Sequence, residues 1–107
     1  MSLKTNEQQA VFDLKKAIEA SYKLLDYKLY GSKARGTDSP DSDVDVMIEL
    51  EDLSPQIELN IANMVFETNI EHSCLVSAVI FGRKELEDGP MNQSPLYRAI
   101  QREGVAL

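Results

Sequence analysis

The chain has 107 residues, of which 43% are hydrophobic and 27% are charged, proportions typical of an ordinary globular domain. We therefore expect one domain over residues 1–107, with a core that needs neither a metal nor a disulfide to fold. The formal charge of -7 argues against sequence-independent binding to nucleic acid, because such binding depends on clustered Lys and Arg side chains.

The sequence shows no pattern of a signal peptide, a membrane span, a disulfide or a cysteine-based zinc site. The first ten residues lack the apolar stretch of a signal peptide, and no apolar run reaches the roughly eighteen residues of a membrane span. Cys74 is the only cysteine, which excludes an internal disulfide and a multi-cysteine zinc site. We therefore expect a cytoplasmic protein that does not contact a membrane.

The first third of the chain predicts a helix, a strand and a turn. Apolar residues recur at steps of three and four from Glu7 to Leu25, which is typical of an amphipathic helix. Residues 26–30 are rich in aromatic side chains and predict a short buried strand that ends at Gly31. Residues 31–36 are compatible with a short helix, and residues 37–42 contain the Thr, Asp, Ser and Pro of a turn.

The segment "SDVDVMIEL", residues 42–50, predicts a strand with two unlike faces. Side chains alternate along a strand, so this one has a largely acidic face and a wholly apolar face. The first face carries Asp43, Asp45, Met47 and Glu49, and the second carries Val44, Val46, Ile48 and Leu50. We expect the apolar face to pack against a helix.

The second half of the chain predicts two helices around one strand. A serine followed by proline marks a helix start at Ser54 and again at Ser94, and the last helix runs through Arg102. Between them, residues 74–81 are apolar on both faces, as in a central strand, and residues 82–93 read as a polar loop. The order of elements predicts an α/β or α+β layer structure with a small sheet, and it leaves the strand directions open.

Asp43 and Asp45 lie on the same face of their predicted strand, with Cα atoms about 7 Å apart. Two carboxylates held this close repel each other unless one is protonated or a cation lies between them. Hard oxygen ligands of this kind suit Mg²⁺ or Mn²⁺. Taken alone, such a pair favours a solvated strand edge, because the spacing is common by chance.

A second motif lies upstream of the acidic pair. Gly31 and Ser32 follow a predicted strand directly, where a glycine lets a phosphate approach the backbone and a serine hydroxyl can bind its oxygens. Ten residues separate Ser32 from Asp43, and a turn of that length can bring the two motifs to one site. Together they indicate a site for a metal and a phosphate.

Three polar residues are further candidates for this site. Lys33 and Arg35 follow the Gly-Ser pair and can neutralise phosphate charge. Ser42 precedes the first aspartate and can orient the turn or bind through hydrogen bonds. We predict these three residues as nucleotide-binding candidates.

The stretch "LYGSKARGTDSPDSDVDVMIEL", residues 29–50, resembles the signature of the minimal nucleotidyltransferases, small members of the DNA polymerase beta-like superfamily. The ending "SPLYRAIQREGVAL" is similar to the tails of such proteins. The resemblance implies a small mixed β-sheet flanked by helices. It also implies that Gly31 and Ser32 contact a triphosphate and that Asp43 and Asp45 hold Mg²⁺ or Mn²⁺.

The resemblance further implies an Mg²⁺-dependent transfer of a nucleoside monophosphate from a nucleoside triphosphate, with ATP as the expected donor, to a hydroxyl acceptor. Some relatives are antitoxins that pair with HEPN-type toxin proteins, so a helical partner of this type is the candidate acceptor. A homodimer is the other candidate assembly, with residues 75–81 as its surface if that strand lies at an edge.

One feature of the superfamily is missing. Its members usually carry a third carboxylate on a later strand beside the first two, but residues 74–81 contain no acidic side chain. Ser77 is expected at that position, and Glu71 is the alternative acid just before the strand. The alternative function is therefore a catalytically weakened nucleotide-binding or protein-interaction module of a toxin–antitoxin-like pair.

Overall fold

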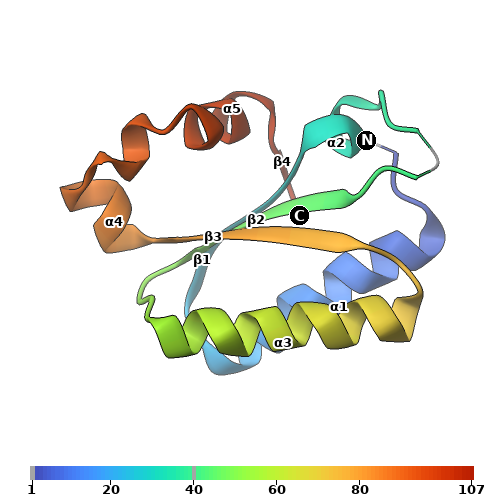
Figure 1. Ribbon diagram of the computed structural model, residues 1–107, viewed down its shortest axis with the longest axis horizontal. Helices are drawn as coiled ribbons and strands as arrows, with labels where there is room; N and C mark the ends of the chain where they lie inside the picture. The colour runs from blue at the N-terminus through green and yellow to red at the C-terminus, as the bar shows by residue number, and fades with distance from the viewer. Residues whose placement is uncertain (1, 40) are drawn as a thin grey trace.

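The computed structural model describes residues 2–39 and 41–107, so Pro40 of the predicted turn lies outside the described residues. A sheet lies between two groups of helices, as Figure 1 shows. In chain order the elements are α1 (Thr5–Ser21), β1 (Leu24–Tyr30), α2 (Gly31–Arg35), β2 (Val44–Leu50), α3 (Pro55–His72), β3 (Val76–Gly82), α4 (Arg83–Asp88), the 3₁₀ turn η1 (Pro90–Gln93), α5 (Pro95–Glu103) and β4 (Val105–Ala106).

The sheet has the strand order β3-β2-β1-β4 and mixed directions. Strands β2 and β3 are parallel, whereas β1 pairs antiparallel with both β2 and β4. This confirms the small mixed sheet flanked by helices. The prediction of a central strand over residues 74–81 is wrong, because β3 lies at an edge. The strand is apolar on both faces because helices cover both. Helix α3 contacts it on one side of the sheet, and Phe81 packs with Leu86 of α4 on the other.

The larger core lies between the sheet and the helix pair α1 and α3. The apolar face predicted for β2 is confirmed, since all four of its residues are fully buried here. The predicted helix caps are confirmed as well. The Ser54 hydroxyl accepts the Ile57 N–H at 3.2 Å, and the Ser94 hydroxyl accepts the Tyr97 N–H at 3.4 Å.

The opposite face of the sheet carries a smaller core beneath α4 and α5. Its buried members are Met47, Phe81, Leu86 and Ile100. The prediction of a polar loop over residues 82–93 is wrong, because this segment forms α4 and η1. Leu86 is its one buried apolar anchor, and the Glu85 carboxylate accepts the Gly82 N–H at 3.2 Å, which fixes the start of α4. One anchor gives too little periodicity for prediction from sequence.

Two boundaries differ from the prediction for the same physical reason. Helix α1 ends at Ser21 rather than Leu25, and β1 begins at Leu24 instead of residue 26. Leu25 continues the helical spacing of apolar residues but belongs to β1, whose first residue, Leu24, pairs with Leu50 in the sheet. The short β4 was not predicted, because its pairing with Lys28 and Leu29 is a contact between distant parts of the chain. In the part of the chain that the structure describes, no helix combines the length and hydropathy that a bilayer crossing requires.

Candidate functional site

The Gly31 turn brings the end of β1 into contact with β2. Gly31 has φ +74°, a left-handed conformation that favours glycine. A Cβ atom at this position would lie 2.5 Å from Oδ2 of Asp45, so the backbone of Gly31 rests directly against that carboxylate. The structure thus brings a residue of the Gly-Ser motif and a residue of the acidic pair to one place.

Asp43 and Asp45 lie at the start of β2. Asp45 is opposite Tyr30 of β1, half-buried, and its side chain shares the sheet face of Met47 rather than the face of the larger core. Asp43 precedes the strand and is exposed. Within residues 2–39 and 41–107, neither carboxylate has a hydrogen-bond or ion-pair partner.

The electrostatics of this pair are unfavourable as they stand. Burial raises the pKa of Asp45, the negative charge of Asp43 raises it further, and the positive charge of Arg35 opposes this shift in part. Two carboxylate groups that repel each other and lack protein partners are a donor set that suits a hard divalent cation. The residues present therefore fit Mg²⁺ or Mn²⁺.

Ser32 and Arg35 occupy the short helix α2 next to this pair. The Ser32 carbonyl accepts the Thr37 N–H at 3.0 Å, which closes the turn of α2, whereas its hydroxyl has no hydrogen-bond partner among the described residues. Arg35 is exposed, and its Nη1 lies 3.2 Å from Oε2 of Glu103 in α5. The Ser32 hydroxyl is therefore available beside the acidic pair, whereas the Arg35 guanidinium is engaged in an exposed ion pair with Glu103.

Lys33 has a different position from the one predicted. Its side chain is completely buried, and its Nζ lies 3.1 Å from Oε1 of Glu7 and 3.3 Å from Oδ2 of Asp38. Burial alone would lower the pKa of Lys33, but the hydrogen bonds and charges of these two carboxylates outweigh it and raise the pKa. The prediction that Lys33 binds nucleotide is therefore corrected: its ammonium group cannot reach a ligand in solvent, and it joins α2 to α1.

Ser42 is engaged within the turn before β2. Its hydroxyl accepts the Ser39 N–H at 2.9 Å, and its own N–H donates to the Ser39 carbonyl at 3.1 Å. On the other side of this loop, Asp38 accepts a hydrogen bond from the Ser2 hydroxyl. Ser42 thus shapes the segment that delivers Asp43 to the site, and direct contact of Ser42 with a nucleotide stays a prediction.

Ser77 lies beside Asp45, where we expected a third carboxylate. The parallel register of β2 and β3 pairs Asp45 with Ser77, which is exposed. The alternative acid, Glu71, lies at the end of α3, where its carboxylate is within 4.8 Å of ligand atoms of Asp13 and His72. It is therefore on the side of the sheet covered by α1 and α3 and does not complete the acidic pair.

Two ion pairs near the site, each with at least one buried charged side chain, were missed by sequence reasoning. One is the Lys33 cluster, and the other joins Glu49 of β2 to Arg83, whose Nε lies 2.8 Å from Oε2 of Glu49. Glu49 shares the face of Asp45, and Arg83 follows β3 directly. In the sequence, Glu49 within an apolar strand and Arg83 just after the next strand are only a weak signal of an ion pair. The pairing could be predicted only if the register of the two strands were known.

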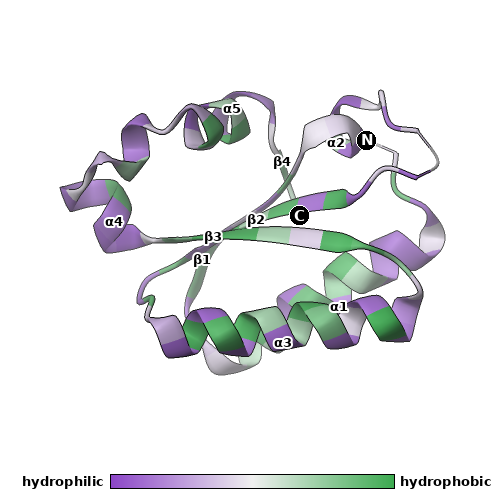
Figure 2. Cartoon of the chain, viewed as in Figure 1, coloured by the Kyte–Doolittle hydropathy of each residue, from purple (hydrophilic) through white to green (hydrophobic). Residues whose placement is uncertain are grey.

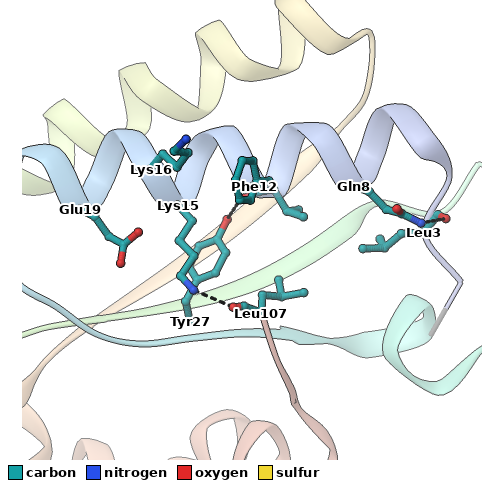
Figure 3. A pocket seen from close by; sticks show the side chains of 9 residues that line it. Leu3, Gln8, Phe12, Lys15, Lys16, Glu19, Tyr27 and Leu107 are labelled. Carbon is teal, nitrogen blue, oxygen red and sulfur yellow. Dashed lines mark hydrogen bonds between the residues drawn. The ribbon is translucent and has the colours of Figure 1, made fainter.

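A separate apolar pocket of about 550 Å³ lies between α1 and the carboxy-terminal residues. Figure 3 shows Tyr27 beneath α1 and the ammonium group of Lys15 directed at Leu107. None of the predicted site residues lines this pocket. It is therefore distinct from the acidic pair and the Gly31 turn.

A comparison with protein-family profiles identifies the family of this chain. The sequence profile of the nucleotidyltransferase domain matches residues 13–105, which is most of the chain. The chain belongs to the nucleotidyltransferase domain family. No curated protein matches the sequence.

Solved structures with a similar fold extend this comparison. A chain from a crystal structure of a toxin–antitoxin with AMP-PNP has a TM-score of 0.64 and 18% identity, over 92% of this chain and 70% of that one. A chain assigned as a minimal nucleotidyltransferase has a TM-score of 0.63 and 19% identity, over 94% and 91% of the two chains. A chain assigned as a nucleotidyltransferase from Sulfolobus solfataricus has a TM-score of 0.55 and 15% identity, over 99% and 89%. At these identities the likeness shows the fold alone.

Proposed function

We propose that this protein transfers a nucleoside monophosphate from a nucleoside triphosphate, with ATP as the donor, to a hydroxyl acceptor. The observation that carries the proposal is the contact of Gly31 with Asp45, beside a second aspartate, with neither carboxylate partnered within the described residues. A positive-φ glycine leaves room for phosphate oxygens at the backbone. The unpartnered acids next to it are suited to the cation that accompanies a triphosphate.

Each residue has a distinct role in this proposal. Asp43 and Asp45 hold the divalent ion, and Gly31 and Ser32 orient the triphosphate through backbone N–H groups and the serine hydroxyl. Arg35 neutralises phosphate charge from the exposed side of α2. When bound, Mg²⁺ supplies charge neutralisation at the phosphates and lowers the pKa of the acceptor hydroxyl.

The chemical step forms one bond and breaks another at the α-phosphorus. The acceptor oxygen forms the new bond, the bond to the bridging oxygen breaks, pyrophosphate leaves, and the hydroxyl proton passes to solvent. Gly31 contacts the half-buried Asp45, and the exposed Asp43 lies two residues before it. The donor and the acceptor therefore meet at this end of β2. Holding them there is the main contribution of the protein to the rate.

The acceptor in this proposal is a hydroxyl group of a partner protein of the HEPN type. The likeness in fold to a chain from a toxin–antitoxin structure with AMP-PNP supports both a nucleotide and a protein partner. The open position of the acidic pair is compatible with a large acceptor, because Asp43 lies exposed before β2.

One observation favours a second candidate function. Ser77 is paired with Asp45 where the superfamily usually has its third carboxylate, so the metal site has fewer acids than in those relatives. A protein of this kind would bind a nucleotide and a partner with little or no transfer. The two candidates share one binding site and differ only in chemistry.

Transfer of label from α-labelled ATP to an added HEPN-type partner protein, together with pyrophosphate release, tests the proposal and separates the candidates. We expect Mg²⁺-dependent release of pyrophosphate by the wild type and its loss in Asp43→Asn. The substitution Ser77→Asp adds a carboxylate beside Asp45 at an exposed position and should increase the rate. Release that persists in Asp43→Asn would contradict the proposal, whereas release only in Ser77→Asp would establish the second candidate.

A further inference from the structure

The outer side of α3 carries large apolar side chains in solvent. Leu59, Phe66 and Ile70 are 56%, 65% and 65% exposed, and Leu75 just before β3 is 59% exposed. The three helical residues are spaced so that they form one stripe along the side opposite the core. Figure 2 shows the hydrophobic segments along α3 between its polar ones. Exposed apolar residues that form one continuous surface mark an interaction site.

A groove runs beside this stripe, between α3 and the edge strand β3. Its volume is about 250 Å³, and its lining is mostly apolar, with Ala62 and Val65 from α3 and Val76, Ala78 and Ile80 from β3. We call this surface, together with Leu59, Phe66 and Ile70, the α3–β3 groove. It provides both a depression and an apolar ridge, which a flat patch lacks.

The edge of β3 is closed to a long added strand at both ends. The Val44 N–H donates to the Leu75 carbonyl at 2.9 Å, so in this parallel pairing Val76, Ala78, Ile80 and Gly82 direct their backbone groups outward. At the first position, the Asn69 side chain accepts the Val76 N–H at 2.8 Å and donates to its carbonyl at 3.1 Å. At the last, Glu85 accepts the Gly82 N–H. An occupant must therefore dock through side chains, as an amphipathic helix does.

The charge of α3 as a whole indicates the occupant. Helix α3 contains no Lys or Arg, and its acidic residues Glu58, Glu67 and Glu71 are all exposed, the last of them on the side of the helix that faces Asp13 of α1. The nearest bases along the chain, Arg83 and Lys84, follow the far end of β3, and Arg83 already pairs with Glu49. A second copy of α3 would set acids against acids, in a chain with a net charge of -7. Lysines and arginines around an apolar stripe are complementary to this surface.

We propose that the α3–β3 groove binds an amphipathic, basic helix of a partner protein. Ser77 of β3 lines the groove and is the register partner of Asp45, so a docked helix lies at the edge of the sheet one strand away from Asp45, on the face covered by α3. This inference rests on the proposed function in one respect, namely that the docked partner is also the acceptor. The docking site itself is inferred from the exposed apolar side chains, the acidic residues of α3 and the closed edge of β3.

The test uses a labelled synthetic amphipathic helix with leucine on one side and lysine on the other, and a glutamate counterpart. We expect saturable binding of the lysine peptide by anisotropy, weakening with salt, and amide NMR shifts confined to α3 and β3. The substitution Phe66→Ser should weaken binding about tenfold. Its matched control is Phe12→Ser, since Phe12 is 58% exposed on α1 but lies beneath the ammonium group of Lys16 at 4.9 Å. That variant should bind as the wild type does.

Several results would overturn the inference. They are absence of saturable binding, equal binding of the glutamate peptide, equal loss in both phenylalanine variants, or a self-associated dimer in sedimentation that Phe66→Ser dissociates. Titration with Mg²⁺ and ATP separates failure of the groove proposal from failure of the proposed function. Phe66→Ser should keep the nucleotide affinity of the wild type, and a wild type that binds the peptide but not ATP would leave the groove intact and refute the nucleotide site.

Discussion

The two faces of the sheet differ in what they bury. Among the described residues, twelve buried residues form one apolar core on the face beneath α1 and α3, whereas the face beneath α4 and α5 has four. The second face instead carries Asp45, the Glu49–Arg83 ion pair and the open end of β2. Most of the stabilising burial therefore lies on one face, while the proposed chemistry lies on the other. Substitutions that distinguish the faces should separate stability from binding.

The largest expected effect is on the apolar face. Ile48→Ala removes a fully buried side chain of β2 and should lower the free energy of unfolding by roughly 2 to 5 kcal/mol. Leu86→Ala, in the small core on α4, should cost less, because the surrounding segment has fewer neighbours to lose and can relax. Urea denaturation measures both. Equal losses would show that the two faces contribute alike and that the comparison is wrong.

Lys33 is the next largest contributor, because its burial leaves two carboxylates dependent on it. Lys33→Met keeps the volume but leaves Glu7 and Asp38 without their cation, and it should cost about 3 kcal/mol. Adding Glu7→Gln should recover part of that loss. The matched control Lys23→Met removes a lysine whose side chain is 68% exposed and should change stability by less than about 0.5 kcal/mol. A loss in Lys33→Met no greater than in the control would refute the structural role.

Gly31 and Gly36 offer a matched test of the site. Both have positive φ, +74° and +75°, so alanine at either should cost about 1 to 2 kcal/mol of stability. Only Gly31→Ala also forces a Cβ against Asp45, because nothing lies within 4 Å of the corresponding position at Gly36. We expect Gly31→Ala to lose binding of ATP with Mg²⁺ and Gly36→Ala to keep it. The same affinity in both variants would mean that the Gly31–Asp45 contact has no functional part.

The smallest effect is a change in alkaline stability. The Tyr27 hydroxyl donates to the Val11 carbonyl at 2.8 Å, and burial raises the pKa of Tyr27 well above its usual value. Because its folded-state pKa is raised, its contribution is fully present below about pH 10 and is lost as pH rises further. Lys33, whose pKa is also raised, acts in the same direction. Tyr27→Phe should lose about 1 kcal/mol at pH 7 and decline less steeply above pH 10 in urea midpoints. An unchanged alkaline slope would contradict the assignment.

The parts of the fold that follow local rules could be predicted from sequence. Alternation along β2 placed its acids and apolar residues on opposite faces, and the Ser-Pro pairs located the starts of α3 and α5. The Gly-Ser and Asp-x-Asp motifs indicated residues that the fold brings into contact. Each of these signals is contained within a few neighbouring residues.

The parts that depend on distant pairing could not be predicted. The edge position of β3 and the strand β4 follow only from how the strands assemble. Lys33 lies in the same motif as Ser32, yet it turns inward because Glu7, far away in sequence, is positioned to pair with it. Charge type alone does not distinguish a phosphate ligand from a buried structural cation.

Calorimetric titration with ATP, with and without Mg²⁺, tests the acidic pair and the Gly31 turn most directly. Wild-type protein and Asp45→Asn would be compared with Asp41→Asn, an exposed acid in the preceding turn whose substitution changes the net charge equally. We expect Mg²⁺-dependent binding in the wild type and in Asp41→Asn, and none in Asp45→Asn. Binding that is independent of Mg²⁺, or that survives in Asp45→Asn, would contradict the proposed site.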